Sequence, residues 1–274
     1  MKQDTQFITG KYRPGMFRMM HRIARRSIRR KFHGAWLVPP APGEHADRGF
    51  DGINDHHGPA IMIMNHAAWW DPMVGLLLHG EFLAARSICA PMDADQLRKF
   101  KIFRGVGMFG IDPDDPASLE LMSDWVDTRF REDDRSTFWI TPQGEFTDPR
   151  QPVKPRPGVA AIAARHPDIP VVSIAIEYPF LLDSKPEVCM RIERVPNPEN
   201  PSTSQWQRVI RDTMQHNGER LAEQVIARNS TDWQPIIGAG KASVHPLYNL
   251  WLRMRGRSID IEVDHRSESN HDRS

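Results

Sequence analysis

The sequence predicts an α/β fold in which helices flank a mixed, mostly parallel sheet, with an amphipathic helix near the N-terminus. Strand-like and helix-like segments alternate from residue 60 onward, which is the order that βα units produce. With 39% hydrophobic and 26% charged residues among 274, the composition is that of a globular chain with a sizeable core. We expect strands at 60–64, 86–90, 137–141, 171–176 and 188–192, and helices at 72–79, 94–103, 117–130, 159–165 and 204–228.

The composition divides the chain into three regions. Residues 1–38 form a basic arm that we expect to associate with membranes, residues 39–257 form the main domain, and residues 258–274 form a polar tail that we expect to be disordered. A connection rich in proline and glycine, 39–58, leads into the main domain. A second basic and aromatic stretch, 246–257, is expected either to touch membrane or to pack in the core.

Several classes of protein are excluded by simple counts. Two cysteines, Cys89 and Cys189, are too few for a disulfide framework and lack the spacing of metal ligands, so we expect a reducing compartment and no metal site. No apolar run reaches the length of about 18 residues that predicts a transmembrane helix. The basic N-terminus is not followed by the apolar core of a signal peptide.

The arm is strongly basic and amphipathic. Residues 11–33 hold nine Lys and Arg and no acidic residue; subtracting these from 36 leaves 27 basic against 35 acidic residues, so the remainder is near −8. Pro14 suits the start of a helix. On a helical wheel, Phe17 and Met20 lie opposite an arc of arginines that includes Arg18, Arg22, Arg25 and Arg29.

This pattern has three interpretations. The favoured one is a helix in the membrane interface, with Phe17 and Met20 in the acyl boundary and the guanidiniums among anionic headgroups. The second is a helix packed on its own domain. The third, an arm that binds nucleic acid, fits poorly with the acidic remainder of the chain, so we expect no nucleic-acid partner. Under the favoured interpretation, we expect a peripheral membrane protein at the cytoplasmic face.

Residues 61–72 carry the strongest chemical signal. A buried strand ends and is followed by Asn65 and His66, and Asp71 opens the next helix five residues after the histidine. Ligands bind at the carboxyl edge of α/β sheets. There a neutral imidazole can take a proton from a hydroxyl while a carboxylate fixes its tautomer. The structural alternatives are a half-buried His66 whose hydrogen bonds are satisfied and an Asp71 that caps the helix before Pro72.

On these residues the chain resembles the glycerolipid acyltransferase superfamily, which includes the lysophosphatidic acid acyltransferases. The first block of that family reads N-H-x-x-x-x-D, matched by Asn65, His66 and Asp71. The resemblance implies that His66 deprotonates an acceptor hydroxyl, which attacks an acyl thioester, and that Asp71 orients His66. It also implies the fold of that family, and Asn65 is placed among the substrate-binding residues.

Three further segments match the family in order, within a resemblance that runs from Phe32 to Tyr178. Residues 138–145 resemble the third block, F-P-E-G-T-R-S, residues 154–160 a basic-x-Gly-Val helix start, and residues 169–176 the fourth block. On this basis the resemblance implies substrate binding by Gln143, Gly144, Glu145, Lys154 and Arg156.

The chain departs from the family pattern at the positions where residues of that family bind phosphate. Gln143 and Phe146 replace an acidic residue and an arginine of the third block, and Asp112 with Pro113 stand where the second block ends in an arginine. Because a guanidinium matches two phosphate oxygens at once, we expect an acceptor without phosphate, such as a neutral glycolipid. A phosphorylated acceptor stays open, since four cations near in sequence are candidate replacements: Arg104, Arg150, Lys154 and Arg156.

The sequence thus predicts an O-acyltransferase that moves a fatty acyl group from acyl-CoA or acyl-carrier protein to a lipid hydroxyl, with no cofactor besides this cosubstrate. Direct transfer is favoured because there is no G-x-S-x-G elbow and no cysteine beside a histidine. The alternatives are a lysophosphatidic acid acyltransferase of phospholipid synthesis, a thioesterase-like hydrolase, and a non-catalytic membrane-docking protein on the same fold.

Overall fold

The computed structural model describes residues 7–40, 49–50, 52–181, 183–228 and 230–238. The expected second basic and aromatic stretch, 246–257, and the expected tail, 258–274, lie outside these ranges. The elements along the chain are α1 (Pro14–Lys31), β1 (Ala35–Leu37), β2 (Ala60–Met64), α2 (Asp71–Phe82), β3 (Ser87–Asp93), α3 (Ala94–Lys99), the 3₁₀ turn η1 (Lys101–Val106), β4 (Met108–Ile111), α4 (Pro116–Glu132), β5 (Ser136–Ile140), α5 (Gly158–Arg165), β6 (Val171–Glu177), β7 (Val188–Arg194), α6 (Thr203–Ala227) and β8 (Gln234–Ile237).

The described strands form one eight-stranded sheet in the order β4-β3-β5-β2-β6-β7-β1-β8. All pairings from β4 to β6 are parallel, as is the pairing of β1 with β7, whereas β6 with β7 and β1 with β8 are antiparallel. The prediction of a mixed, mostly parallel sheet is therefore confirmed. Because β2 lies between β5 and β6, the loops that follow these three parallel strands meet at one edge.

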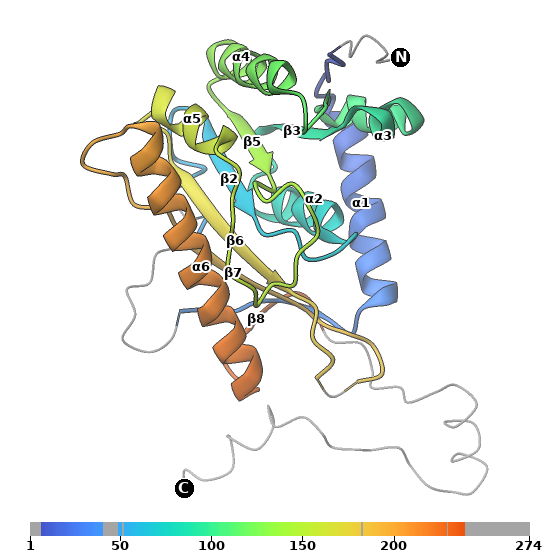
Figure 1. The fold of residues 1–274 in the computed structure, drawn as a ribbon. Coiled ribbons are helices and arrows are strands. Elements are labelled where there is room, and N and C mark those ends of the chain that lie inside the picture. Colours follow the sequence, from blue (N-terminus) through green and yellow to red (C-terminus); the bar gives the residue numbers. More distant parts are fainter. Residues whose placement is uncertain (1–6, 41–48, 51, 182, 229, 239–274) are drawn as a thin grey trace, which may run out of the picture.

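Helices cover both faces of the sheet (Figure 1). On one face, α1 and α2 pack on a core that includes Met62, Met64 and Ile174. On the other face, α4, α5 and α6 pack on a core that includes Ile61 and Ile63. Successive residues of β2 thus enter opposite cores, which explains why its sequence is apolar throughout.

The predicted elements are found with shifts of a few residues at their ends, with one exception among the helices. The helix expected at 94–103 ends at Lys99, and the chain tightens into η1 before Gly107, whose φ of 110° turns it into β4. Strands β1, β4 and β8 were not predicted. They have three or four residues each and are defined by partners distant in sequence.

Helix α1 is part of the core, which corrects the prediction for its apolar side. Phe17 and Met20, expected to enter the acyl boundary of a membrane, are only 3% and 5% exposed and pack in the same core as α2. The second interpretation, packing on its own domain, therefore holds for these two residues. Because β1 also pairs within the sheet, the predicted boundary at residue 38 does not separate an arm from a body. No helix among the described residues is long and apolar enough to span a bilayer.

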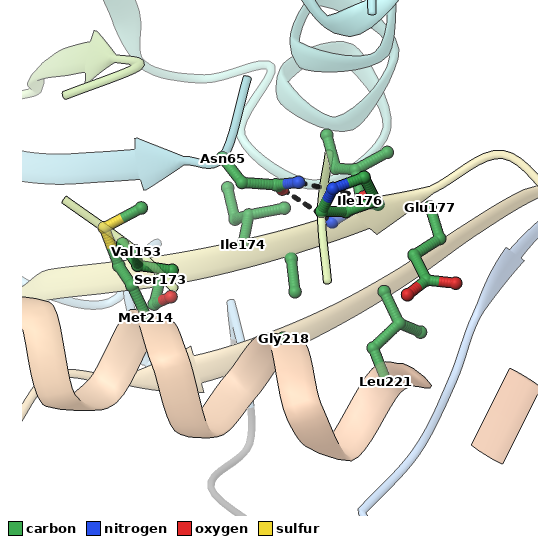
Figure 2. A pocket seen from close by; sticks show the side chains of 11 residues that line it. Asn65, Val153, Ser173, Ile174, Ile176, Glu177, Met214, Gly218 and Leu221 are labelled. Carbon is green, nitrogen blue, oxygen red and sulfur yellow. Dashed lines mark hydrogen bonds between the residues drawn. The ribbon is translucent and has the colours of Figure 1, made fainter. Parts of the chain in front are cut away.

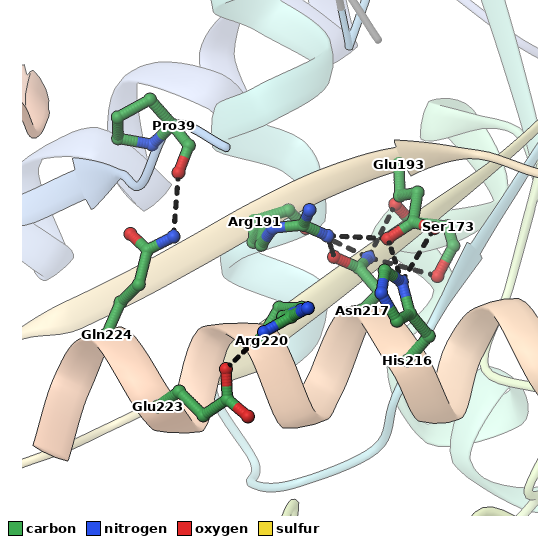
Figure 3. Close-up of polar contacts among 9 residues, drawn as sticks. All are labelled: Pro39, Ser173, Arg191, Glu193, His216, Asn217, Arg220, Glu223 and Gln224. Atoms are coloured by element: carbon green, nitrogen blue, oxygen red, sulfur yellow. Dashed lines mark hydrogen bonds and ion pairs between the residues drawn. The ribbon is translucent and has the colours of Figure 1, made fainter. Parts of the chain in front are cut away.

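A polar cluster centred on the buried Asn217 and Arg191 holds α6 against β6 and β7 (Figure 3). The side-chain amide of Asn217 donates to the carbonyl oxygens of Ser173 (3.0 Å) and Arg191 (3.2 Å), and Arg191 donates back to Asn217 Oδ1 at 2.8 Å. Glu193 accepts from Arg191 and lies 2.9 Å from the His216 ring. These bonds satisfy polar groups that are costly to bury alone, and they hold β6, whose carboxyl end reaches the site described next.

Candidate active site

The predicted catalytic pair comes together at the carboxyl end of β2. His66 Nδ1 lies 2.8 Å from Asp71 Oδ2. The Asp71 side chain is fully buried, whereas that of His66 is 19% exposed. An ionised carboxylate beside Nδ1 keeps the proton on that nitrogen, so the lone pair of the ring is on Nε2. The imidazole is thus oriented as a general base whose second nitrogen is available to a substrate.

Asp71 does not act as a helix cap. Helix α2 begins at Asp71 itself, and the residue in the capping position, Trp70, makes no side-chain capping bond. The Asp71 carboxylate turns back along the chain, where Oδ2 accepts from the backbone N–H of Ala68 at 2.9 Å. The capping alternative is therefore wrong, while the expected proline in the first turn is present.

A third side chain contacts Asp71 from another strand. Tyr178 follows β6 directly, and its hydroxyl donates to Asp71 Oδ1 at 2.6 Å. Burial, together with the neighbouring Asp71 carboxylate, raises the pKa of Tyr178 well above its usual value of 10. The sequence analysis did not identify Tyr178 as a site residue. Tyr178 is identified by its place directly after β6, because β6 is the neighbour of β2 and both strands end at the same edge of the sheet.

Asn65 joins β2 to β6 at the edge of the site. Its Nδ2 donates to the Ile176 carbonyl oxygen at 3.0 Å, and its Oδ1 accepts from the Ile176 N–H at 2.8 Å. Figure 2 shows this pair of bonds above a pocket between β6 and α6, lined by residues that include Val153, Met214 and Gly218. The amide of Asn65 thus sets the position of the loop that carries His66, and its contact with substrate stays a prediction.

Gln143 supports the backbone of His66. Its Oε1 accepts from the His66 N–H at 3.1 Å, and its Nε2 donates to Thr147 Oγ1 at 2.5 Å. The Thr147 N–H in turn donates to the His66 carbonyl oxygen at 2.8 Å. The buried Gln143 and its loop therefore hold the backbone of His66 on both sides, a role that the sequence analysis did not foresee. Substrate binding by Gln143 stays a prediction.

Phe146 lies against the imidazole of His66. The centroids of the Phe146 and His66 rings are 4.2 Å apart, and Phe146 is 58% exposed. This is the position where the resemblance places a phosphate-binding arginine. The surface beside His66 is therefore apolar and aromatic at the position where the resemblance implies a guanidinium.

The candidate cations lie at different distances from this centre. Arg156 packs over Gly144, where a Cβ atom would lie 2.9 Å from its Nε, and it donates to the Pro113 carbonyl oxygen at 2.8 Å. Arg150 pairs with Glu177 at 3.0 Å. Arg104 precedes β4 and donates to Thr9, so it lies toward the opposite end of the parallel strands. The structure thus brings Arg156 and Arg150 to the site edge but not Arg104.

The remaining predicted site residues are Gly144, Glu145 and Lys154. Gly144 has a φ of 73°, a conformation that favours glycine in the turn after β5. Glu145 and Lys154 are exposed, so their expected roles in substrate binding stay predictions. Among the residues that the structure describes, no group of three or more His, Cys, Asp or Glu side chains is placed to hold a metal ion.

The chain is similar to known proteins in family and in fold. Residues 29–177 match the family model described as Acyltransferase. The crystal structure of the 1-acyl-sn-glycerophosphate (LPA) acyltransferase PlsC from Thermotoga maritima has a similar fold, with a TM-score of 0.51 and 14% identity over 75% of this chain and 79% of that chain. No curated protein matches the sequence.

Proposed function

Because the chain belongs to the Acyltransferase family, whose model matches more than half of its residues, we propose that it transfers a fatty acyl group from acyl-CoA or acyl-carrier protein to a hydroxyl of a lipid acceptor. The observation that carries this proposal is the His66–Asp71 pair, with Asp71 buried and His66 accessible. A hydrolase that activates water with the same base is the alternative.

The proposed mechanism follows from the orientation of the imidazole. Nε2 of His66 takes the proton of the acceptor hydroxyl as its oxygen attacks the thioester carbonyl carbon. The new C–O bond forms, the C–S bond breaks, and the imidazolium returns its proton to the leaving thiolate. Asp71 stabilises the imidazolium while the proton is held. General-base catalysis of this kind contributes typically about 10²- to 10⁴-fold in rate.

Two features support direct transfer rather than a covalent acyl-enzyme. Both cysteines are buried, and burial raises the pKa of the Cys89 thiol to about 12, so this thiol is not a nucleophile at neutral pH. The sequence also has no G-x-S-x-G elbow, which would place a serine nucleophile beside the base. A ternary complex of donor, acceptor and enzyme is the form that this mechanism requires.

We further propose that the preferred acceptor carries no phosphate next to the reacting hydroxyl. Phe146 presents an aromatic face beside His66, and Arg156 is already engaged by the Pro113 carbonyl oxygen and lies 3.5 Å from Asp114. Arg150 is paired with Glu177. An aromatic ring that lies beside the base suits the apolar face of a sugar or a neutral headgroup better than a phosphate dianion.

Purified protein is expected to acylate a neutral glycolipid acceptor at least about tenfold faster than lysophosphatidic acid, which corresponds to at least about 1.4 kcal/mol of discrimination. The measurement is an acceptor screen with labelled acyl-CoA and identification of the products by mass spectrometry. Phe146→Arg should move the preference toward the phosphorylated acceptor, because it restores a guanidinium beside the base.

Two outcomes of this screen would contradict the proposals separately. A large preference of the unmodified protein for lysophosphatidic acid overturns the proposal of a non-phosphorylated acceptor and leaves acyl transfer intact. Release of free fatty acid without consumption of any acceptor favours the thioesterase-like hydrolase instead. The variant Phe100→Arg serves as a matched control, since Phe100 is an exposed aromatic residue between α3 and η1 whose ring contacts Phe103.

We propose that α1 binds the surface of a membrane rich in anionic lipids, on its cytoplasmic face. Arg18, Arg22 and Arg29 are exposed, and the exposed apolar residues beside them are Met19 and Ile23 instead of Phe17 and Met20. Phe32, directly after α1, packs against Trp70 and Tyr178, so this helix ends beside the candidate active site. Trp69, which precedes Trp70 in the sequence, is exposed, and so is Phe180, two residues after Tyr178. Both add apolar surface beside the end of the helix.

Reversing the charge of Arg18, Arg22 and Arg29 to glutamate is expected to weaken binding to anionic vesicles by at least about 100-fold at low salt, because each lost basic residue near the surface costs about 1 kcal/mol and the new carboxylates are repelled. Arg25 is left unchanged because it pairs with Glu81. Vesicle sedimentation at rising salt checks the result. The control reverses Arg131, Arg208 and Arg211, which are exposed on α4 and α6 over the other face of the sheet. Equal binding by both variants contradicts the proposal.

A further inference from the structure

The geometry points to Tyr178 as a positioning residue of the proposed reaction, which acts on His66 through Asp71 and does not touch substrate. The inference rests on the proposed function. It adds a third residue to the His66–Asp71 pair, and this residue follows a different strand, β6. Tyr178 and Asp71 are 107 residues apart in sequence, and a 2.6 Å hydrogen bond joins them.

The two oxygens of Asp71 are used differently. Oδ2 faces His66 Nδ1 at 2.8 Å and accepts from the Ala68 N–H at 2.9 Å. Oδ1 accepts from the Tyr178 hydroxyl. A fully buried carboxylate needs donors for both oxygens, because an unsatisfied charged oxygen in the interior is costly. Tyr178 therefore fixes the rotation of the carboxylate and so the direction in which Oδ2 meets the imidazole.

The Tyr178 hydroxyl keeps its proton and can therefore always donate a hydrogen bond to Asp71. Burial and the Asp71 charge favour its neutral form, and their effect raises the pKa of Tyr178 well above 10. The hydroxyl therefore stays protonated throughout the range in which an imidazole works as a base. It cannot serve as the general base itself, because it points at a carboxylate and holds its proton.

The phenol also reaches Asp71 from a rigid support. Tyr178 follows β6 directly, and the two hydrogen bonds between Asn65 and Ile176 lock the end of β6 to the loop that carries His66. The Tyr178 ring packs against Phe32, with centroids 5.6 Å apart. Two independent elements thus fix the donor and the acceptor of the 2.6 Å bond, which is what a preorganised orienting contact requires.

The test removes one oxygen atom. Tyr178→Phe is expected to lower kcat for acyl transfer about 10- to 100-fold with KM changed less than about twofold, since misplacement of a reacting group has costs of this order. The low-pH limb of the kcat/KM profile should move toward higher pH, because a carboxylate that has lost a donor holds the imidazolium proton more tightly. Tyr12→Phe, a partly buried tyrosine outside the site, is the matched control and should leave both unchanged.

A double substitution separates a positioning role from a merely structural one. If Tyr178 acts through Asp71, adding Tyr178→Phe to Asp71→Asn should change kcat less than about twofold, whereas independent effects would multiply. Thermal denaturation identifies a variant that is destabilised. Such a variant is titrated below its melting temperature, where the His66 ring resonances in NMR spectra report the same shift in protonation without an activity assay.

The outcomes are distinguishable from failure of the proposed function. If His66→Ala is inactive but Tyr178→Phe keeps the rate and the pH profile of the unmodified protein, the inference is overturned and acyl transfer stands. A Tyr178→Phe effect that multiplies fully with that of Asp71→Asn overturns it as well. If His66→Ala is fully active, the proposed function is overturned. The NMR titration then decides separately whether Tyr178 changes the protonation of His66.

Discussion

Replacement of His66 by alanine is expected to lower kcat/KM for acyl transfer by about 10²- to 10⁴-fold, the range that a general base contributes. Without the imidazole, the acceptor hydroxyl must lose its proton to water as it attacks the thioester, and no group returns a proton to the leaving thiolate. The residual rate reports what binding and orientation of donor and acceptor contribute without the base.

The protein should keep its fold in this variant, because the His66 side chain is partly exposed and its imidazole contacts the Asp71 carboxylate and the Phe146 ring. Circular dichroism and thermal denaturation check this. His57→Ala is a suitable control, since it removes an exposed imidazole from the loop that precedes β2, at the opposite end of the strand from His66. A purified His66→Ala protein with nearly the activity of the unmodified chain would remove the catalytic assignment.

The central part of the fold follows from local patterns in the sequence. The uninterrupted apolar run at 60–64 has the length of a strand buried on both faces, and it forms β2 in the middle of the sheet. Asp71 and Pro72 mark the start of a helix, and α2 begins there. The spacing of His66 and Asp71 within one loop also made their contact predictable, because the loop is short and starts and ends in rigid elements.

Features that depend on distant partners were not predictable in the same way. Strand β1 has three residues, and only its pairing with β7 and β8 defines it. The contact of Tyr178 with Asp71 depends on the pairing of β6 with β2, which places the two chain segments at one edge. No periodicity within either segment contains this information.

The apolar side of α1 shows a different limit. A helix with Phe17 and Met20 on one side and arginines on the other has the same pattern whether the apolar side meets lipid or a neighbouring helix. The structure places α2 there, so burial in the protein decides the question for these two residues. Asn65 and Gln143 are similar, since a polar side chain at a strand end can bind substrate or a backbone group, and both have backbone partners here.

Asp71→Asn is expected to reduce kcat by about 10²- to 10⁴-fold, nearly as much as loss of His66. Three donors, from His66, Ala68 and Tyr178, converge on the two oxygens of Asp71. If the new amide group faces Tyr178, its neutral oxygen no longer balances the charge of the imidazolium. If the amide group faces His66, it donates to Nδ1, which moves the ring proton to Nε2 and removes the base.

The change in stability distinguishes this explanation from structural damage. Asp71 does not cap α2, and an asparagine can keep the hydrogen bond from Ala68 while the Tyr178 hydroxyl rotates to accept, so the free energy of unfolding should fall by only about 1 kcal/mol. Denaturant unfolding measures this loss, and steady-state kinetics measure the rate. Asp115→Asn, at the cap of α4, is the control, because it changes an aspartate that does hold a helix end. An Asp71→Asn protein that is stable and retains more than about a tenth of the normal kcat would show that the carboxylate is not what makes His66 a base.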